Sequence, residues 1–352
     1  MKHFYGLFLI WFVMVPFSAG AEDLSTLYDT AKLAREKPRF KRIINEMFTR
    51  AILPNLTRDE KRVLNDAKFE FPLTGETNHN PMDYYSGKRG RWDFVAMPIL
   101  SLVFLEDLST AYAWLHIRGF SLETIDEYVT MLRYKRAADF TGGRYPPPLK
   151  ALQIPEDALK DRKVDGLSLR FRNSAFAFIL LHELGHIYYG HRGYKGITTA
   201  QARINEQNAD RFALDVLHRT STIPMGAILF FQAQAYFMPN KGQLRAEGKL
   251  KTDKEWEAYL RTKITHPLTA DRLRAMAVYL DNSAGKARPG PNRETLRYIM
   301  TRLEHIAGIL EEPDLQGCMA VVAHRADPSI LAPRRPREKT ATLFDRWCGK
   351  KK

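Results

Sequence analysis

The pattern of hydrophobic and polar positions predicts a mostly helical chain. The apolar stretch over residues 93–136 is broken just before Ser121, a candidate N-cap, which favours two buried helices. A second strongly apolar helix is expected over residues 175–190, after the polar cap candidates Asn173 and Ser174. Helical spacing of apolar residues predicts further helices in the second half of the chain, over residues 202–218, 224–237, 255–263, 267–281 and 293–311.

Two segments carry strand or loop signals instead. Residues 167–172, Leu-Ser-Leu-Arg-Phe-Arg, alternate apolar and polar side chains, which predicts a short strand with one buried face. Residues 67–92 contain several prolines, glycines and asparagines and are expected to form loop or short strand. Together with the polar, helical pattern of residues 22–66, these segments predict the α+β class, mostly α, with a small sheet.

The N-terminus is typical of a secretory signal peptide over residues 1–21. Lys2 precedes the apolar run Phe4–Phe17, and a small-x-small cleavage site ends at Ala21. The apolar run is shorter than the roughly 20 residues of a membrane span, so an uncleaved anchor is the alternative. The best later candidate for a span, residues 94–117, contains a proline and two acids and fits a buried helix better. We therefore expect an exported protein, periplasmic or secreted, with no transmembrane segment in the mature chain.

Composition and charge narrow the class of partner. The chain has 352 residues, of which 45% are hydrophobic and 27% charged, as in a globular protein. Its net charge of +14 favours anionic partners such as membrane headgroups or acidic polymers, and a solvated basic surface is the alternative. Because there is no basic stripe with interleaved aromatic residues, nucleic acid is not expected as a partner.

Three regions are expected after the signal peptide. The Pro-rich run at residues 146–148 suggests a linker that ends an N-terminal helical region, residues 22–148. A core over residues 149–285 follows, and then a C-terminal helical region with a basic tail, residues 286–352, whose Pro-Arg-rich part is expected to be a flexible extension. The two cysteines, Cys318 and Cys348, could form a disulfide or remain free thiols.

His182-Glu183-Leu184-Gly185-His186 is an H-E-x-x-H motif at the end of an apolar run. On a helix, residues four apart point from one face, so both imidazoles can bind the same metal ion. Glu183 lies about 100° around the helix, where it can take a proton from a zinc-bound water during attack on a carbonyl group. We expect His182 and His186 to bind one zinc ion and Glu183 to be the general base. The alternative is a helix whose polar side chains are satisfied by hydrogen bonds within the protein.

The helix expected over residues 202–218 offers a third ligand. Apolar residues at helical spacing mark its buried face, and Glu206 and Asp210 lie on or beside that face. Catalytic zinc sites usually have three protein ligands, so we expect Glu206 to complete the set. Asp210 is expected to accept a hydrogen bond from a ligand histidine and to orient its ring. A solvated helix edge is the alternative for this acidic pair.

These motifs carry a family resemblance. H-E-x-x-H followed by Asn-Glu-x-x-Ala-Asp over residues 205–210 resembles the gluzincin metallopeptidases, and the gap between the motifs resembles that of thermolysin-type enzymes. The wording of the second motif, with Thr-His-Pro over residues 265–267 and Arg272, resembles the family of the CAAX prenyl endopeptidases and periplasmic chaperone-proteases. The resemblance covers residues 167–280 and implies a zincin-like catalytic core with two zinc-binding helices.

Hydrolysis also requires a group that stabilises the tetrahedral oxyanion. We expect His266 to stabilise the oxyanion, because the corresponding loop lies near the metal in the family that this sequence resembles. A capping or surface role is the alternative. Tyr188, Tyr189 and Tyr194 are weaker candidates for the same role.

The metzincin pattern does not fit. It needs glycine and histidine three and six residues after the second motif histidine, where this chain has Tyr189 and Arg192. His191 is therefore expected to lie at a helix end or in a loop rather than to bind the metal.

The sequence predicts an exported metalloendopeptidase with one zinc ion, acting on polypeptides. The alternative is a non-catalytic zinc-site protein that binds peptides or anionic surfaces in the cell envelope. The strand expected at residues 167–172 could provide a sheet edge for an extended substrate peptide, or be purely structural. The role of residues 22–165, as propeptide, lid or substrate domain, stays open.

Overall fold

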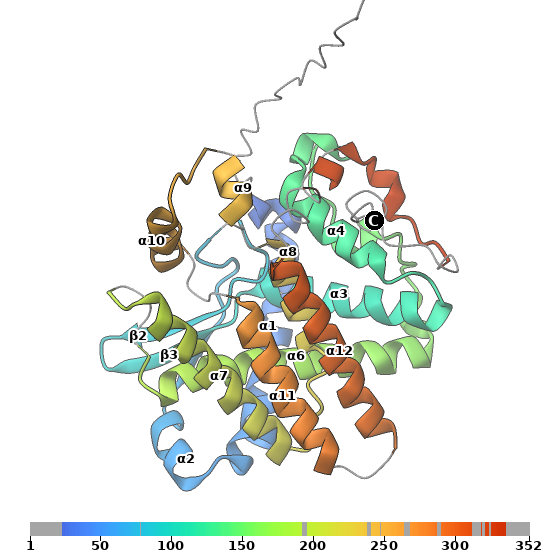
Figure 1. The fold of residues 1–352 in the computed structure, drawn as a ribbon. Coiled ribbons are helices and arrows are strands. Elements are labelled where there is room, and N and C mark those ends of the chain that lie inside the picture. Colours follow the sequence, from blue (N-terminus) through green and yellow to red (C-terminus); the bar gives the residue numbers. More distant parts are fainter. Residues whose placement is uncertain are drawn as a thin grey trace, which may run out of the picture.

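The structure, a computed structural model, describes residues 23–77, 79–191, 196–237, 241–246, 248–263, 268–286, 290–311, 318, 321–323 and 325–335. It is mostly helical with one small sheet, which confirms the predicted α+β class (Figure 1). The signal peptide expected over residues 1–21 lies outside the described residues. The α-helices are α1 (Thr30–Glu46), α2 (Arg58–Leu64), α3 (Ile99–Arg118), α4 (Glu123–Tyr134), α5 (Pro148–Ala151), α6 (Arg162–Tyr188), α7 (Thr199–Arg219), α8 (Ala227–Phe237), α9 (Lys241–Ala246), α10 (Asp253–Lys263), α11 (Ala270–Lys286) and α12 (Pro291–Glu311).

The sheet comes from the segment expected to be loop or short strand. Its strands are β1 (Lys68–Glu70), β2 (Tyr85–Arg89) and β3 (Trp92–Ala96), in the order β1-β3-β2. β1 runs parallel to β3, whereas β2 and β3 form an antiparallel hairpin in which Arg89 pairs with Trp92. Gly90 in the two-residue turn has φ +61°, a backbone conformation that favours glycine. β3 occupies the start of the region predicted to be helical, and α3 begins only after Pro98.

The predicted strand at residues 167–172 is wrong, because this segment lies within α6. The helix starts much earlier, where the Asp161 side chain accepts a hydrogen bond from the backbone N–H of Lys163 at 2.8 Å. Six alternating residues are also compatible with a helix, and the buried positions Val164, Ser168, Phe171 and Ala175 follow helical spacing. The cap candidates Asn173 and Ser174 are accordingly interior residues of this helix.

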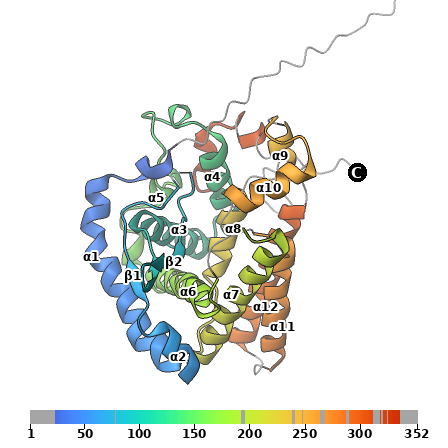
Figure 2. The same cartoon turned by 90° about the vertical axis from the view of Figure 1, so that its left-hand side faces the viewer.

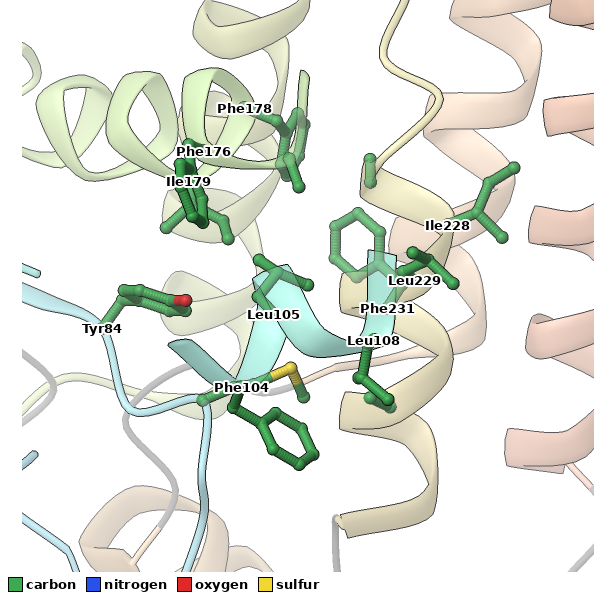
Figure 3. Packing of buried hydrophobic residues seen from close by; sticks show 14 of the residues in the cluster. Tyr84, Phe104, Leu105, Leu108, Phe176, Phe178, Ile179, Ile228, Leu229 and Phe231 are labelled. Carbon is green, nitrogen blue, oxygen red and sulfur yellow. The ribbon is translucent and has the colours of Figure 1, made fainter. Parts of the chain in front are cut away.

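α6 lies in the centre of the molecule. Figure 2 shows α3 and α6 between α1 on one side and the pair α11–α12 on the other. α3 is buried almost all round, and it packs against α6, as do α7 and α8. Figure 3 shows side chains of α3, α6 and α8 meeting, and Phe178 of α6 contacts Phe231 of α8 edge-on with ring centroids 5.4 Å apart.

One hydrophobic cluster extends from the N-terminal helices to the C-terminal segment, from Leu24 to Leu331. Side chains before and after the Pro-rich run at residues 146–148 therefore share the same core. No helix within the described ranges is both long enough and apolar enough to cross a membrane.

An ion cluster ties the N-terminal region to α6. Glu106 of α3 accepts hydrogen bonds from both Nη atoms of Arg39 in α1, at 2.9 and 2.5 Å. It also accepts one from Arg172 of α6 at 2.7 Å. Beside it, the buried carboxylate of Asp107 accepts a hydrogen bond from Tyr28 at 2.7 Å. The helix that carries the H-E-x-x-H motif is thus held by charged as well as apolar contacts.

The C-terminal segment is docked as far as Arg335, so the prediction of a flexible extension is wrong for this part. The carbonyl oxygen of Arg334 accepts a hydrogen bond from the N–H of Ser121 at 2.8 Å, and its guanidinium lies 2.5 Å from the buried carboxylate of Glu127. Arg335 lies over the ring of Phe120 and donates to the carbonyl oxygen of residue 118. Cys318 is disulfide-bonded, and Cys348 lies outside the described residues.

Candidate metal centre and active site

The H-E-x-x-H motif lies in the last turns of α6, where α6 and α7 approach closely. A Cβ atom on Gly185 would lie only 3.0 Å from Cα of Ala209 and 3.1 Å from Cβ of Phe212. Glycine at this position therefore lets the backbone of α7 pack directly against α6. The close approach brings Glu206 of α7 towards the two imidazoles.

Three donor groups converge between these helices. Nε2 of His182 and Nε2 of His186 are 3.1 Å apart. Glu206 places one carboxylate oxygen 3.5 Å from Nε2 of His182 and the other 3.4 Å from Nε2 of His186. Tetrahedral zinc with bonds of about 2.0–2.1 Å needs donor atoms roughly 3.3–3.4 Å apart, close to the His182–His186 spacing and to the spacing between His186 and the nearer Glu206 oxygen. One donor atom from each of the three residues lies within 4.8 Å of the other two.

All three donors are buried, with exposed fractions of 4% for each histidine and 0% for Glu206. They form the one group of at least three such side chains, among the described residues, whose ligand atoms could hold a metal ion. This group could bind a metal ion, and its nitrogen and oxygen donors suit zinc.

Asp210 lies where the sequence predicted it. Its Oδ1 is 3.0 Å from Nδ1 of His182, on the far side of the ring from Nε2. A hydrogen bond from Nδ1–H to this carboxylate leaves the lone pair of Nε2 directed at the donor group. Asp210 is therefore close enough to orient the ring of His182.

Arg272 of α11 has a role that sequence reasoning missed. Its guanidinium donates to Asp210 through Nε at 2.5 Å and through Nη2 at 2.8 Å, and its Nη1 lies 2.6 Å from Glu206. The ring of Phe231 lies beneath it, 5.3 Å away. One buried cation thus fixes both Glu206 and Asp210. Its place at helical spacing before the apolar residues Met276 and Leu280 was a signal that it faces inward.

The pKa values of the two histidines shift in opposite directions. Burial alone would lower the pKa of His182, but the carboxylates of Asp210 and Glu206 outweigh it and raise the pKa to about 9. Burial lowers the pKa of His186, against the opposing charge of Glu206. Burial would also raise the pKa of Asp210, but Arg272 and His182 hold it below its usual range.

The charge balance of the cluster fits a divalent cation. With both imidazoles neutral, as metal ligation requires, the buried charged side chains described in the cluster are three carboxylates (Glu183, Glu206 and Asp210) and one guanidinium (Arg272), whose net charge is −2. A divalent ion would neutralise it. The raised pKa of His182 has the same origin, because without a metal ion a proton on its ring supplies part of the positive charge.

Glu183, the expected general base, is 2% exposed, and its charge acts on both His186 and Arg272. His191 lies beside the centre at the end of α6, with its Nδ1 2.9 Å from Nδ1 of His186. Tyr188 and Tyr189 pack with Phe212. The remaining oxyanion candidates, His266 and Tyr194, lie outside the described residues.

The sequence model of the family Peptidase U49 matches residues 157–233, a segment that contains all of α6 and α7. No curated protein matches the chain. No solved structure matches it either. The match to a peptidase family and the buried His182–His186–Glu206 group together fit a metallopeptidase in general.

Proposed function

We propose that this chain is an exported metalloendopeptidase with one zinc ion, held by His182, His186 and Glu206. The observation that carries the proposal is the set of donor spacings, 3.1, 3.4 and 3.5 Å, in a fully buried group with a surplus of negative charge. The family match over the same two helices supports hydrolysis of peptide bonds. Export rests on the pattern of residues 1–21 alone.

Each residue then has a separate task. A zinc ion at this site would act as a Lewis acid and lower the pKa of a water molecule towards 7. The carboxylate of Glu183 accepts a proton from the attacking water and passes it to the leaving amide nitrogen. Asp210 fixes the ring of His182 through Nδ1, and Arg272 holds the carboxylates of Asp210 and Glu206 in place. We assign His266 to the oxyanion, by resemblance.

Residues 167–172 are helical and cannot provide a sheet edge for a substrate peptide, but β2 can. β2 is at one edge of the sheet and pairs with β3 on one side; no described strand pairs with its other side. It also lies against α6, the helix with the two histidines. We propose that an extended polypeptide adds to this edge through backbone hydrogen bonds.

Glu183→Gln tests the proposal. We expect the purified wild-type protein to bind one zinc ion and to cleave casein, and chelation to stop cleavage. Glu183→Gln should keep the zinc and lose about 10²–10⁴-fold in cleavage rate, since it removes only the proton acceptor. Glu60→Gln is a control, because Glu60 is also a buried acid but accepts a hydrogen bond from Arg219 and does not belong to the donor group.

Two results would contradict the proposal that the chain is a zinc-dependent peptidase. One is a wild-type protein that holds no zinc. The other is a Glu183→Gln variant that cleaves like the wild type. A protein that binds zinc and peptides in both forms, with no cleavage by either, would support the non-catalytic alternative.

A further inference from the structure

We propose that His191 is a positioning residue for the metal centre: its Nδ1 accepts the Nδ1–H of His186 and so fixes the tautomer and ring orientation of that ligand. This inference rests on the proposed zinc site. The contact that carries it is the 2.9 Å separation of the two Nδ1 atoms.

The end of α6 is built to make this contact. After the last helical residue, Gly190 adopts φ +68°, and its N–H donates to the carbonyl oxygen of Ile187 at 3.0 Å. The N–H of His191 donates to the carbonyl oxygen of His186 at 2.9 Å. This pair of hydrogen bonds is the Schellman motif, which places the second residue after the cap beside the third residue before it. An apolar pair usually fills these positions, whereas here both side chains are histidines.

The direction of the hydrogen bond follows from the metal centre. Nε2 of His186 faces the other donors, 3.1 Å from His182 and 3.4 Å from Glu206, so binding of the metal ion requires the lone pair on this nitrogen. The ring proton of a neutral His186 is then on Nδ1, and this N–H needs an acceptor because the side chain is 4% exposed. Nδ1 of His191 is in position to accept it, which puts the proton of the His191 ring on Nε2.

The same geometry shows why His191 is not itself a ligand of this group. It approaches His186 from the Nδ1 side, whereas the donor group lies on the Nε2 side. The ring of Tyr189 stacks on His191 with centroids 5.7 Å apart and an interplanar angle of 23°. His191 is therefore held from the backbone and from one ring face.

The two ligand histidines thus have different outer partners. His182 is oriented by the carboxylate of Asp210, which Arg272 holds, whereas His186 is oriented by a neutral imidazole from its own helix end. Groups in such positions contribute about 10–100-fold to metal affinity. Loss of His191 should therefore weaken zinc binding without removing a ligand.

The test is the zinc dissociation constant, measured by competition with a chelating dye. We expect His191→Ala to raise it about 10–100-fold. His191→Asn should restore the wild-type value, because the amide Oδ1 occupies nearly the position of the imidazole Nδ1 and can accept the same proton. His218→Ala, a change of an exposed histidine in α7, is the matched control and should bind zinc like the wild type.

An unchanged dissociation constant in a folded His191→Ala protein would overturn the inference. So would equal weakening by alanine and asparagine, which would indicate lost packing instead of a lost acceptor. If His191→Ala does not fold, His191→Leu against His191→Asn makes the same distinction. A wild-type protein that binds no zinc would instead refute the proposed function, so the two failures can be told apart.

Discussion

Two ion clusters involve α6, one partly buried and one buried, and they differ in how their charge is balanced. In the first, Glu106 of α3 receives guanidinium groups from Arg39 and Arg172, so every negative charge has a partner from the chain. In the second, Arg272 serves both Glu206 and Asp210, and acids are in excess among the charged side chains that the structure describes there. The first cluster links α1, α3 and α6, and its charge is balanced without an added ion. The second calls for a further cation, which is the physical reason to expect a metal there.

Asp126 of α4 shows a third way of burying an acid. It accepts a hydrogen bond from the amide of Gln232 in α8, and the charge of Arg302 also acts on it. Burial is the dominant effect and raises the pKa of Asp126 to about 7. Protonation therefore reduces the buried negative charge of Asp126. Arginines balance the charge of Glu106, and a metal ion could balance that of Glu206.

The largest expected effect is on the free energy of unfolding, and it distinguishes the cluster at Glu106 from the cluster at Glu206. Arg272→Met should lower the free energy of unfolding of the metal-free protein by about 3–5 kcal/mol, because it leaves buried carboxylates without their cation. Arg39→Met should cost about 1 kcal/mol or less, since Arg39 is one-third exposed and Glu106 keeps Arg172. Urea unfolding with a chelator present measures both. Equal losses would mean that the two clusters do not differ in the way described.

The second effect concerns pH. Because the pKa of Asp126 in the folded chain, about 7, lies above its ordinary value of 3.8, the protonated form stabilises the fold. That contribution is complete below about pH 4 and is lost as the pH rises through about 7.

Asp126→Asn keeps the neutral form at every pH. Its free energy of unfolding should therefore decline less between pH 4 and 8 than that of the wild type, by up to about 4 kcal/mol. Denaturant unfolding at a series of pH values measures this, with the exposed Asp66→Asn as control. Parallel curves for Asp126→Asn and the wild type would refute the assignment.

The smallest effect tests the close approach of α6 and α7. Gly185→Ala should cost about 1–3 kcal/mol, because its Cβ would contact the backbone of Ala209, and it should also weaken zinc binding by moving Glu206 away from the histidines. Gly166→Ala in the same helix has open space around it and should be neutral or stabilise by up to about 1 kcal/mol. Thermal unfolding and zinc titration of both variants provide the comparison. If both alanines behave alike, the contact does not set the spacing of the donors.

Local periodicity was enough to predict which of the candidate site residues lie close together. The spacing of His182 and His186, and of Glu206 and Asp210, depends only on helical repeat, and the structure brings these four side chains together. The later helices were also predicted from apolar spacing, and their ends lie within about five residues of the predicted ones. The pair split near Ser121 was predicted too, although its first helix begins only at Ile99.

What the sequence did not reveal depends on contacts between distant segments or on very short patterns. The alternation at residues 167–172 is too short to distinguish a strand from a helix, and the extra turns of α6 are stabilised by packing on α3. The partners of Arg272 and of Arg334 are far away in sequence, so their roles could not be read from local patterns. The division at residue 148 and the export signal remain predictions.

The docked end of the chain has a practical consequence. Anyone trimming this protein for crystallisation would be tempted to stop after α12, since the composition beyond it suggests an expendable basic tail. Such a cut would remove the guanidinium of Arg334 from Glu127, which is 2% exposed, and would uncover the turn between α3 and α4. The shortest useful version of the chain ends beyond Arg335.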